Sequence, residues 1–473
     1  MVEDIKFILN NDLISIDYNS TETLLDFLRK GKKLVGTKEG CREGDCGACT
    51  VMVGSLGDNV IKYRTINSCL YSIGKVVGKH VVTIEGLNST FLNLIQESFL
   101  NKGASQCGFC TPGFVVSFTC YLINNNNYEL ENAIRSIAGN ICRCTGYLSI
   151  KRALEEVLNK FSIQKNRTKD MKFLIKQNIL PQYFNNIESR LILLNSESQD
   201  FLQEKTKDQF ILGGGTDIYI QEQNKIFDAN PLFTERILKP EIVVENLNCK
   251  VSGSVTFEML NESEIFKQYF PEIETYMDLI ASLQIRNSAT LAGNIVNASP
   301  IGDLTIFFLA LDAEIELSNF SQKRVMKLKD LFLDYKKLDK TDDELLTWIN
   351  FILPDKNSKF NFIKVSKRTH LDIASVNSAI LIKIHDDIVK DVNLSLGGVA
   401  PVPLYLKKST TALKNRQINN LTILDFISQV QKEINPISDI RGSVKYKRFL
   451  VSQIIKKHFI QLFPEKVVTE EIL

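Results

Sequence analysis

The first residues of the chain alternate between apolar and polar positions in the way that strands do. Two short apolar stretches, Lys6–Leu9 and Leu13–Ile16, flank the turn-forming residues Asn10–Asp12. This pattern predicts a β-hairpin over residues 5–17.

A short helix and two more strands are predicted next. Ser20 and Thr21 offer an N-cap for a helix over Leu24–Arg29, which would stop at Gly31. Two strand-like stretches then follow a loop rich in glycine and cysteine at 36–49: Thr50–Val53 and Val60–Arg64. We expect a β-rich fold wrapped around that loop.

From residue 89 the apolar positions follow a helical period. Thr111 and Pro112 supply an N-cap and a proline for the first turn of one of the helices. Four helices are predicted: Phe91–Leu100, Gly113–Ile123, Glu129–Ile137 and Ile150–Phe161. The polar stretch at 162–170 predicts a linker. The predicted segments are therefore 1–86, 87–161, the linker 162–170, a helix–strand mixture over 171–350, and an α+β segment over 351–473.

Composition and charge exclude several classes of protein. Hydrophobic residues make up 44% and charged residues 24% of the 473 residues, which is ordinary for a globular protein. Lys and Arg number 57 against 55 Asp and Glu, so no strong positive charge indicates a nucleic-acid partner. No apolar stretch approaches the roughly 18 residues of a membrane span. Because acidic residues stand where a signal peptide would be basic, we expect a cytoplasmic protein.

The ten cysteines are concentrated near the N-terminus, where nine of them precede residue 145. A disulfide framework suits a small secreted domain, whereas this chain is long and shows no export signal. Clustered thiols in a reducing compartment indicate metal binding instead.

The first cysteine group has the spacing of a plant-type ferredoxin. Cys41, Cys46 and Cys49 follow a C-x4-C-x2-C pattern, and Cys69 lies twenty residues further on. The neighbouring glycines let the backbone pass close to a [2Fe–2S] cluster. A structural zinc site also uses four thiolates, but it favours two compact knuckles over a single wrapped loop.

The second group combines a C-x2-C with a C-x-C pair, each at a helix end: Cys107, Cys110, Cys142 and Cys144. Taken alone, this set makes a structural zinc site a stronger alternative than it is for the first group. Beside the first group, a second iron–sulfur cluster is favoured. Cys120 falls inside an apolar helix and is expected to be a buried, non-ligating residue.

Two glycine-containing loops occur in the later segments. Phe210–Ile218 runs from a strand into three glycines, Thr and Asp, which can form an anion-binding nest but not a Rossmann fingerprint. Thr290–Asn294 continues to Asn297–Asp303 and offers small and polar residues. Each loop alone is also typical of an ordinary turn.

Taken together, these motifs resemble the xanthine dehydrogenase / molybdenum hydroxylase family. The strings GCREGDCGACTVMV, SCL, QCGFCTPGF and GNICRCTGY are similar to its iron–sulfur domains, and GGGTD, TLAGNIVNASPIGD and SDIRGSVKYKRFL to its flavoprotein part. The resemblance covers essentially the whole chain. It implies an α+β multidomain fold: a β-grasp ferredoxin-like domain, a four-helix iron–sulfur bundle, a two-part α+β FAD-binding domain and a C-terminal α+β flavoprotein domain.

The resemblance also implies roles for particular residues. Each cysteine group would hold a [2Fe–2S] cluster, with Gln106 and Cys144 near the pterin of a partner's cofactor. No side chain of this chain would be catalytic. The residues implied in FAD binding are Leu212, Gly213, Gly214, Gly215, Thr216, Asp217, Ile218, Thr290, Leu291, Ala292, Gly293, Asn294, Asp303, Ile349 and Lys364. Arg368 and Asp372 match a nearby stretch.

Ala292 departs from the family, which usually has glycine at this position. If the position needs a positive φ, alanine costs on the order of 1 kcal/mol there and the loop would differ locally.

The function implied is electron transfer beside a molybdenum site, most closely as the small subunit of a bacterial-type enzyme. Because the chain ends soon after the flavoprotein-like segment, we expect a molybdopterin-binding large subunit as partner, in a heterotetramer. Electrons would pass from molybdenum through both clusters to FAD and then NAD+. Oxidation of hypoxanthine and xanthine to urate is the first choice. Aldehyde, nicotinate or carbon monoxide oxidation, a stand-alone NADH:acceptor reductase and a non-catalytic redox sensor remain open.

Overall fold

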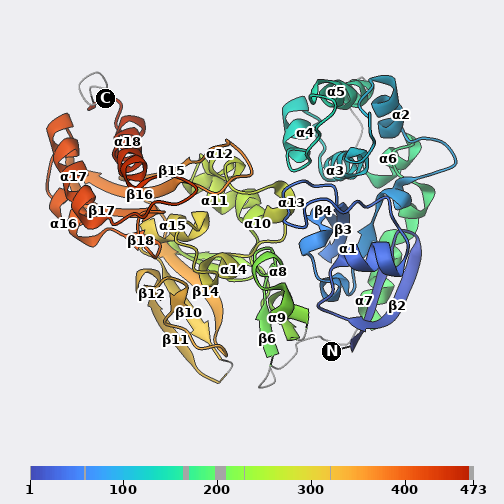
Figure 1. Ribbon diagram of the computed structural model, residues 1–473, viewed down its shortest axis with the longest axis horizontal. Helices are drawn as coiled ribbons and strands as arrows, with labels where there is room; N and C mark the ends of the chain where they lie inside the picture. Colours follow the sequence, from blue (N-terminus) through green and yellow to red (C-terminus); the bar gives the residue numbers. More distant parts are fainter. Residues whose placement is uncertain are drawn as a thin grey trace. The chain divides into compact units, whose positions relative to one another are not determined.

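The computed structural model describes residues 2–57, 60–162, 170–197, 209–227, 229–319 and 321–467 (Figure 1). Its internal contacts divide it into two compact units. The first comprises Met1–Ile237 with Ser282–Ser288, and the second comprises Leu238–Ala281 with Ala289–Leu473. Residues 163–169 of the predicted linker lie outside the described residues. These two units are coarser than the predicted domains, whose boundaries stay predictions.

The first unit begins with a five-stranded sheet in the order β2-β1-β5-β3-β4. Its strands are β1 (Val2–Leu9), β2 (Asp12–Asn19), β3 (Thr50–Gly57), β4 (Val60–Asn67) and β5 (His80–Val82). β1 and β5 are parallel and the other pairs are antiparallel. The predicted hairpin is confirmed, because Leu9 pairs with Asp12 across a tight turn.

The helix after this hairpin begins at the predicted residue and its last turn ends at Gly31, but it has a different cap. α1 covers Leu24–Asp26 and continues as a π-helical turn over Phe27–Gly31. Thr23 is its N-cap and accepts a hydrogen bond from the backbone N–H of Asp26 at 3.2 Å. The prediction of Ser20 or Thr21 as the cap was wrong, because the Thr21 hydroxyl bonds Asn19 at 2.7 Å instead.

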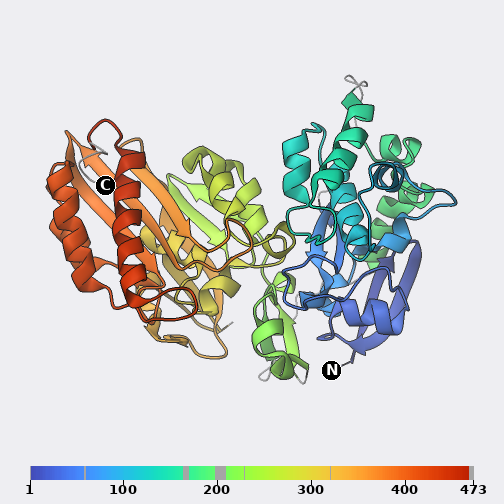
Figure 2. The same ribbon diagram turned by 45° about the horizontal axis from the view of Figure 1, so that its top comes forward.

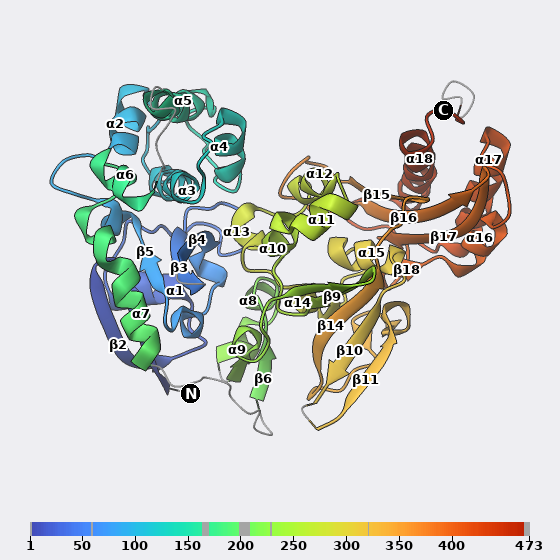
Figure 3. The ribbon, with the colours of Figure 1, turned by 180° about the vertical axis from the view of Figure 1, so that it is seen from behind.

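The four predicted helices of the next segment are present in the structure, with shifted ends (Figure 3). They are α2 (Leu94–Asn101), α3 (Thr111–Asn124), α4 (Leu130–Ser136) and α5 (Leu148–Ser162). α3 is apolar all round because it packs against β3 and β4 as well as against the other helices. Its N-cap is Cys110, so Thr111 opens the helix instead of capping it.

The remainder of the first unit consists of short elements. They are α6 (Met171–Lys176), α7 (Ile187–Glu197), β6 (Gln209–Leu212), α8 (Ile218–Gln221), α9 (Gln223–Phe227), β7 (Asn230–Phe233) and α13 (Leu283–Arg286). Short 3-10 turns lie at Ser68–Leu70, Ile73–Val76, Ile84–Leu87, Gln182–Asn186 and Thr234–Arg236. β6 and β7 form a two-stranded parallel sheet.

The second unit contains an antiparallel sheet in the order β11-β10-β14-β9-β8. Its strands are β8 (Ile242–Glu245), β9 (Asn248–Ser252), β10 (Glu314–Ser318), β11 (Lys323–Lys327) and β14 (Leu345–Ile352). The accompanying elements are α10 (Phe257–Glu262), α11 (Glu264–Tyr269), α12 (Ile273–Asp278), α14 (Leu291–Val296), α15 (Asp303–Ala310), the 3-10 turn Leu328–Asp330, β12 (Phe332–Asp334) and β13 (Lys337–Leu338).

A second antiparallel sheet of this unit runs β15-β16-β17-β18. It comprises β15 (Ser358–Val365), β16 (Val376–His385), β17 (Ile388–Gly397) and β18 (Leu404–Tyr405), followed by α16 (Lys407–Leu413), α17 (Asn420–Glu433) and α18 (Val444–Leu462). α17 and α18 lie side by side and bury a core against the sheet (Figure 2). The α+β multidomain class is therefore confirmed. Among the described helices, none is both long enough and apolar enough to cross a membrane.

Candidate iron–sulfur and flavin sites

The first cysteine group is assembled by the loop before β3 and by the 3-10 turn after β4. The Sγ atoms of Cys49 and Cys69 lie 3.4 Å apart, and both residues are buried. Cys41 accepts hydrogen bonds on Sγ from the backbone N–H of Glu43 at 3.3 Å and of Cys46 at 3.4 Å. A hydrogen bond from the Cys46 thiol, together with these N–H groups, lowers the pKa of Cys41 to about 4, although burial raises it. The site therefore stabilises a thiolate.

The loop that carries these thiols depends on Gly47. Its φ is +67°, and a Cβ there would lie 2.3 Å from the carbonyl oxygen of Gly139. A side chain at this position would therefore be strained and would also collide with backbone. Glycine at residue 47 allows the first cysteine loop to contact the second one closely.

The second cysteine group lies between the start of α3 and the loop before α5. The Sγ atoms of Cys107 and Cys144 lie 3.7 Å apart, and both residues are exposed. Cys110 caps α3 and pairs with Cys142, which is buried. Burial and the hydrogen bond with Cys142 raise the pKa of the Cys110 thiol to about 12. One thiol pair of the group is thus open to solvent and the other is sheltered.

Both groups present their four thiols as two close pairs. The pairs are Cys41 with Cys46, Cys49 with Cys69, Cys107 with Cys144, and Cys110 with Cys142. A tetrahedral zinc site would instead bring all four sulfurs to roughly 3.8 Å of one another. Among the described residues, no group of three or more Cys, His, Asp or Glu is placed to hold one metal ion. Pairs of thiols suit a binuclear cluster, in which each iron takes two protein ligands.

The loops of the two cysteine groups bond each other directly. The backbone N–H of Ile141 donates to the carbonyl oxygen of Cys46 at 2.9 Å, and Asn140 Nδ2 donates to the carbonyl oxygen of Gly47 at 2.9 Å. Asn140 is buried and also accepts a bond from Ser117 Oγ at 2.8 Å. The bond from Ile141 thus links Cys46, a member of the first group, to the residue next to Cys142 of the second group. No local motif indicated this role for Asn140.

The first glycine loop lies in the first unit, between β6 and α8. Gly215 has a φ of +81°, which favours glycine, and its carbonyl oxygen accepts a bond from the backbone N–H of Tyr219 at 3.1 Å. Tyr219 is buried in one apolar cluster with Cys49 and Cys69, and its hydroxyl donates to the carbonyl oxygen of Thr21 at 2.7 Å. The element that follows the expected flavin loop therefore packs on the first cysteine group. Tyr219 was not identified from the sequence.

The second expected flavin stretch, Thr290–Asn294, lies in the second unit. Thr290 caps α14, because its Oγ1 accepts a bond from the backbone N–H of Gly293 at 3.2 Å. Ala292 lies inside this helix and is not among the described residues with positive φ. The condition under which alanine would be strained is therefore not met. Asn294 Oδ1 accepts bonds from the backbone N–H and Oγ1 of Thr305, both at 3.0 Å.

Asp303 and Lys364 form a sheltered ion pair in the same unit. Lys364 Nζ lies 2.8 Å from Asp303 Oδ2, and only 2% of the Lys364 side chain is exposed. Asn377 Nδ2 donates to Asp303 Oδ1 at 2.6 Å, while Asn377 Oδ1 is buried without a partner. These groups can receive a polar ligand. Ile349, in contrast, is fully buried in β14, and its expected FAD contact stays a prediction.

The loop that follows β15 is held together by hydrogen bonds between its own residues. The backbone N–H of Arg368 donates to Asp372 Oδ2 at 3.0 Å, and its guanidinium donates to the carbonyl oxygen of Leu371 at 2.6 Å. Gln106, which the resemblance places near a pterin, is exposed beside Cys107.

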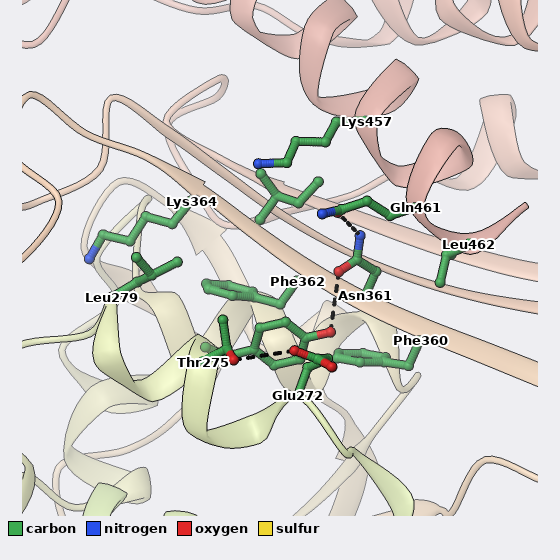
Figure 4. A pocket seen from close by; sticks show the side chains of 12 residues that line it. Glu272, Thr275, Leu279, Phe360, Asn361, Phe362, Lys364, Lys457, Gln461 and Leu462 are labelled. Carbon is green, nitrogen blue, oxygen red and sulfur yellow. Dashed lines mark hydrogen bonds between the residues drawn. The ribbon is translucent and has the colours of Figure 1, made fainter. Parts of the chain in front are cut away.

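A pocket of about 450 Å³ runs along β15, between α12 and α18 (Figure 4). Lys364 and Lys457 line it together with three aromatic residues. Tyr276 donates to Asn361 Oδ1 at 3.2 Å, and Asn361 Nδ2 donates to Gln461 Oε1 at 2.9 Å. The polar wall of the pocket is thus held by bonds within the protein.

Four domain families match the chain in succession. The 2Fe-2S iron-sulfur cluster binding domain matches residues 7–71, and the [2Fe-2S] binding domain matches residues 83–155. The FAD binding domain in molybdopterin dehydrogenase matches residues 195–355. The CO dehydrogenase flavoprotein C-terminal domain matches residues 361–462.

Whole-chain relatives agree with these matches. Xanthine dehydrogenase 1 of Arabidopsis thaliana is 28% identical over 93% of this chain and 38% of its own length. Xanthine dehydrogenase/oxidase of Rattus norvegicus is 26% identical over 96% of this chain and 38% of its own length. The chain thus spans little more than a third of these relatives.

The fold of about half of the chain is also found in a solved structure. A chain of carbon monoxide dehydrogenase from Hydrogenophaga pseudoflava aligns with a TM-score of 0.50 and 21% identity, over 53% of this chain and 88% of that one. The domain matches define an iron–sulfur flavoprotein with two [2Fe–2S] domains and an FAD-binding domain. The chain is similar to xanthine dehydrogenases over almost its whole length, and the aligned part of these relatives is little more than a third of each.

Proposed function

We propose that this chain is the electron-transfer subunit of a molybdenum hydroxylase, acting between a molybdopterin-binding partner and NAD+. The observation that carries the proposal is the arrangement of eight thiols in four close pairs, within a chain that also has an FAD-binding domain. When bound, iron–sulfur clusters transfer single electrons, and FAD connects such transfers to two-electron acceptors.

The residues proposed to hold the clusters fit that role. Cys41, Cys46, Cys49 and Cys69 would hold one cluster, and Cys107, Cys110, Cys142 and Cys144 the other. Cys49 and Cys69 are buried, so this part of the chain would exclude water from its cluster. The N–H groups that already bond Cys41 would stabilise negative charge on a ligating sulfur.

Within the first unit, the loop Leu212–Ile218 is proposed to bind the diphosphate of FAD. Within the second unit, Thr290–Asn294 is proposed as a further FAD-binding stretch. Asp303 and Lys364 would bind the nucleotide through the polar groups that they already present to each other. The chain itself needs no general base, because it would position cofactors and leave substrate activation to the partner.

The exposure of the second cysteine group supports a partner protein. Cys107 and Cys144 are exposed, and Phe109 beside them is 45% exposed. An electron carrier needs such an open edge to exchange electrons with another protein. The relatives are also much longer than the aligned part. We propose a molybdopterin-binding large subunit, in a heterotetramer, as the partner.

Xanthine and hypoxanthine are the proposed substrates of the complex, with the cytoplasm as its location. The whole-chain relatives named above act as xanthine dehydrogenases, and abundant free thiols suit a reducing compartment. A carbon monoxide oxidising complex is the second candidate, because one matching domain and one similar structure bear that name.

Cofactor analysis of anaerobically purified protein tests the proposal. We expect four irons, four acid-labile sulfides and one FAD per chain, with no zinc. The complex isolated from its native source should then reduce NAD+ with xanthine. Zinc in place of iron, or a chain that binds no flavin, would refute the proposed function. Reduction with carbon monoxide but not with xanthine would favour the second candidate.

A further inference from the structure

A partly buried group of charges joins the iron–sulfur part of the first unit to its glycine loop. Lys75 lies in the 3-10 turn Ile73–Val76, and Lys79 just before β5. Lys75 Nζ lies 3.3 Å from Glu235 Oε2, and Lys79 Nζ lies 2.7 Å from Glu235 Oε1. Burial would raise the pKa of Glu235, but the two lysines lower it to about 2. Two ammonium groups therefore share one carboxylate.

Lys75 makes a further bond that Lys79 does not share. Its Nζ donates to the carbonyl oxygen of Gly213 at 3.1 Å, although the two residues are 138 positions apart. Only 4% of the Lys75 side chain is exposed, and its ammonium lies 5.0 Å from the centre of the Tyr71 ring. A bond from a buried cation to a carbonyl is among the stronger hydrogen bonds in proteins.

This bond determines how the next peptide group is turned. In a trans peptide the carbonyl oxygen and the following N–H point in opposite directions. No cis peptide occurs in the part of the chain that the structure describes. With the Gly213 carbonyl directed at Lys75, the N–H of Gly214 is directed away from Lys75. The positive charge also polarises this peptide and makes its N–H a better donor.

We propose that Lys75 is a positioning residue for the diphosphate of the flavin nucleotide, because it turns the Gly213–Gly214 peptide so that the Gly214 N–H can donate to a phosphate oxygen. This inference rests on the proposed function of the glycine loop. It assigns a residue of the ferredoxin-like part of the chain to the binding of a cofactor held by another part. Glu235 shares its carboxylate between the two lysines, and Lys79 bonds Glu235 and the Tyr71 hydroxyl instead of the loop.

The test compares Lys75→Met with Lys79→Met in the full-length chain, after removal of the flavin. The two variants remove the same charge from the same carboxylate, but only the first removes the bond to Gly213. FAD binding is followed by quenching of flavin fluorescence, and ADP binding by calorimetry. We expect Lys75→Met to weaken both ligands by about tenfold or more, and Lys79→Met to weaken them by less than about threefold. Iron content should stay at the wild-type value.

Comparison of FAD with ADP, and of Lys75→Met with Lys79→Met, shows whether the effect of Lys75 is specific to the diphosphate. ADP carries the diphosphate but no flavin ring, so a loss seen for FAD and not for ADP would overturn the inference. Wild-type affinity in Lys75→Met, or an equal loss in Lys79→Met, would overturn it as well. Lys75→Arg, which keeps the charge and the donor, should recover most of the affinity.

A further variant keeps the inference testable if Lys75→Met does not fold. Glu235→Gln removes the carboxylate charge and leaves the bond from Lys75 to Gly213. We expect it to bind FAD at least as tightly as the wild type, and a tenfold loss would count against the inference. A wild-type chain that binds neither FAD nor ADP would refute the proposed function itself. Wild-type binding with an unaffected Lys75→Met refutes only the role of Lys75.

Discussion

Lys364 and Asp303 form an ion pair of 2.8 Å whose lysine is almost completely withdrawn from solvent. Lys364 lies in β15 and Asp303 in the first turn of α15, so the two residues are 61 positions apart in the sequence. Asn377 donates a second hydrogen bond to the same carboxylate at 2.6 Å. The carboxylate is thus held by two side chains of one sheet and directed by them. Both members of the pair are also proposed to contact FAD.

Substitution of Lys364 by methionine should destabilise the second unit markedly. Removing one partner leaves the sheltered carboxylate of Asp303 without its cation, which costs roughly 3–5 kcal/mol in buried pairs. Chemical denaturation followed by circular dichroism would measure the loss. Lys383→Met is the matched control, because Lys383 pairs with Asp355 at 2.7 Å with 48% of its side chain exposed. The control should cost less than about 1 kcal/mol, and an equal cost for both variants would contradict the prediction.

Local patterns predicted the parts of the molecule that are built from neighbouring residues. The turn Asn10–Asp12 and the spacing of Cys41, Cys46 and Cys49 are visible in a short window of sequence. The hairpin was confirmed for that reason. The cap of α1 was placed wrongly, because three hydroxyl residues stand near its start and Thr21 bonds Asn19 instead.

Contacts between distant residues could not be predicted in the same way. Asn140 bonds the Gly47 carbonyl across 93 positions, and Tyr219 bonds the Thr21 carbonyl across 198. Neither residue belongs to a local motif, since its role depends on how separate segments pack. The cysteine spacing therefore indicated the kind of site, while the three-dimensional fold was needed to find the residues that support it.

Serine substitutions should remove the clusters one at a time. Cys49→Ser removes one member of a buried pair, so we expect iron content to fall from four to two per chain, with the second cluster retained. Cys107→Ser should give the complementary loss. Iron and sulfide analysis with visible circular dichroism would distinguish the two clusters. Cys120→Ser is the control, because Cys120 lies buried within α3, apart from both groups of paired thiols. A loss of iron in that variant, or none in Cys49→Ser, would contradict the assignment.

Two buried histidines should make the protein less stable in mild acid. Burial lowers the pKa of both His80 and His458 to about 3. The unfolded chain takes up protons on them below a pH of about 6.5, whereas the folded chain does not until a pH of about 3. Stability is therefore complete above pH 6.5 and falls as the pH is lowered towards 3. Each histidine should cost roughly 2 kcal/mol between pH 7 and pH 5.

Denaturation midpoints at these two pH values would measure the effect. His458→Gln should abolish the part of the stability loss between pH 7 and pH 5 that comes from His458, because glutamine does not titrate. Glutamine can still bond Ser378, whose Oγ lies 3.0 Å from His458 Nε2. His385→Gln is a suitable control, because His385 is largely exposed and its side chain pairs only with Asp386 among the ion pairs of the described residues. Equal stability of the wild type at pH 7 and pH 5 would show that the histidines are protonated in the folded state.

Replacement of Ala292 by glycine, the residue that the resemblance leads us to expect at this position, should weaken the protein. Ala292 is the second residue of α14, is almost fully buried, and donates its backbone N–H to the carbonyl oxygen of Gly253 at 3.0 Å. Its φ is not positive, so glycine would relieve no strain. It would instead add conformational entropy to the unfolded chain and remove a packed methyl group, at a cost of roughly 1 kcal/mol. Thermal denaturation of Ala292→Gly with and without FAD would measure this cost, and a gain in stability would show that the loop has the strained geometry after all.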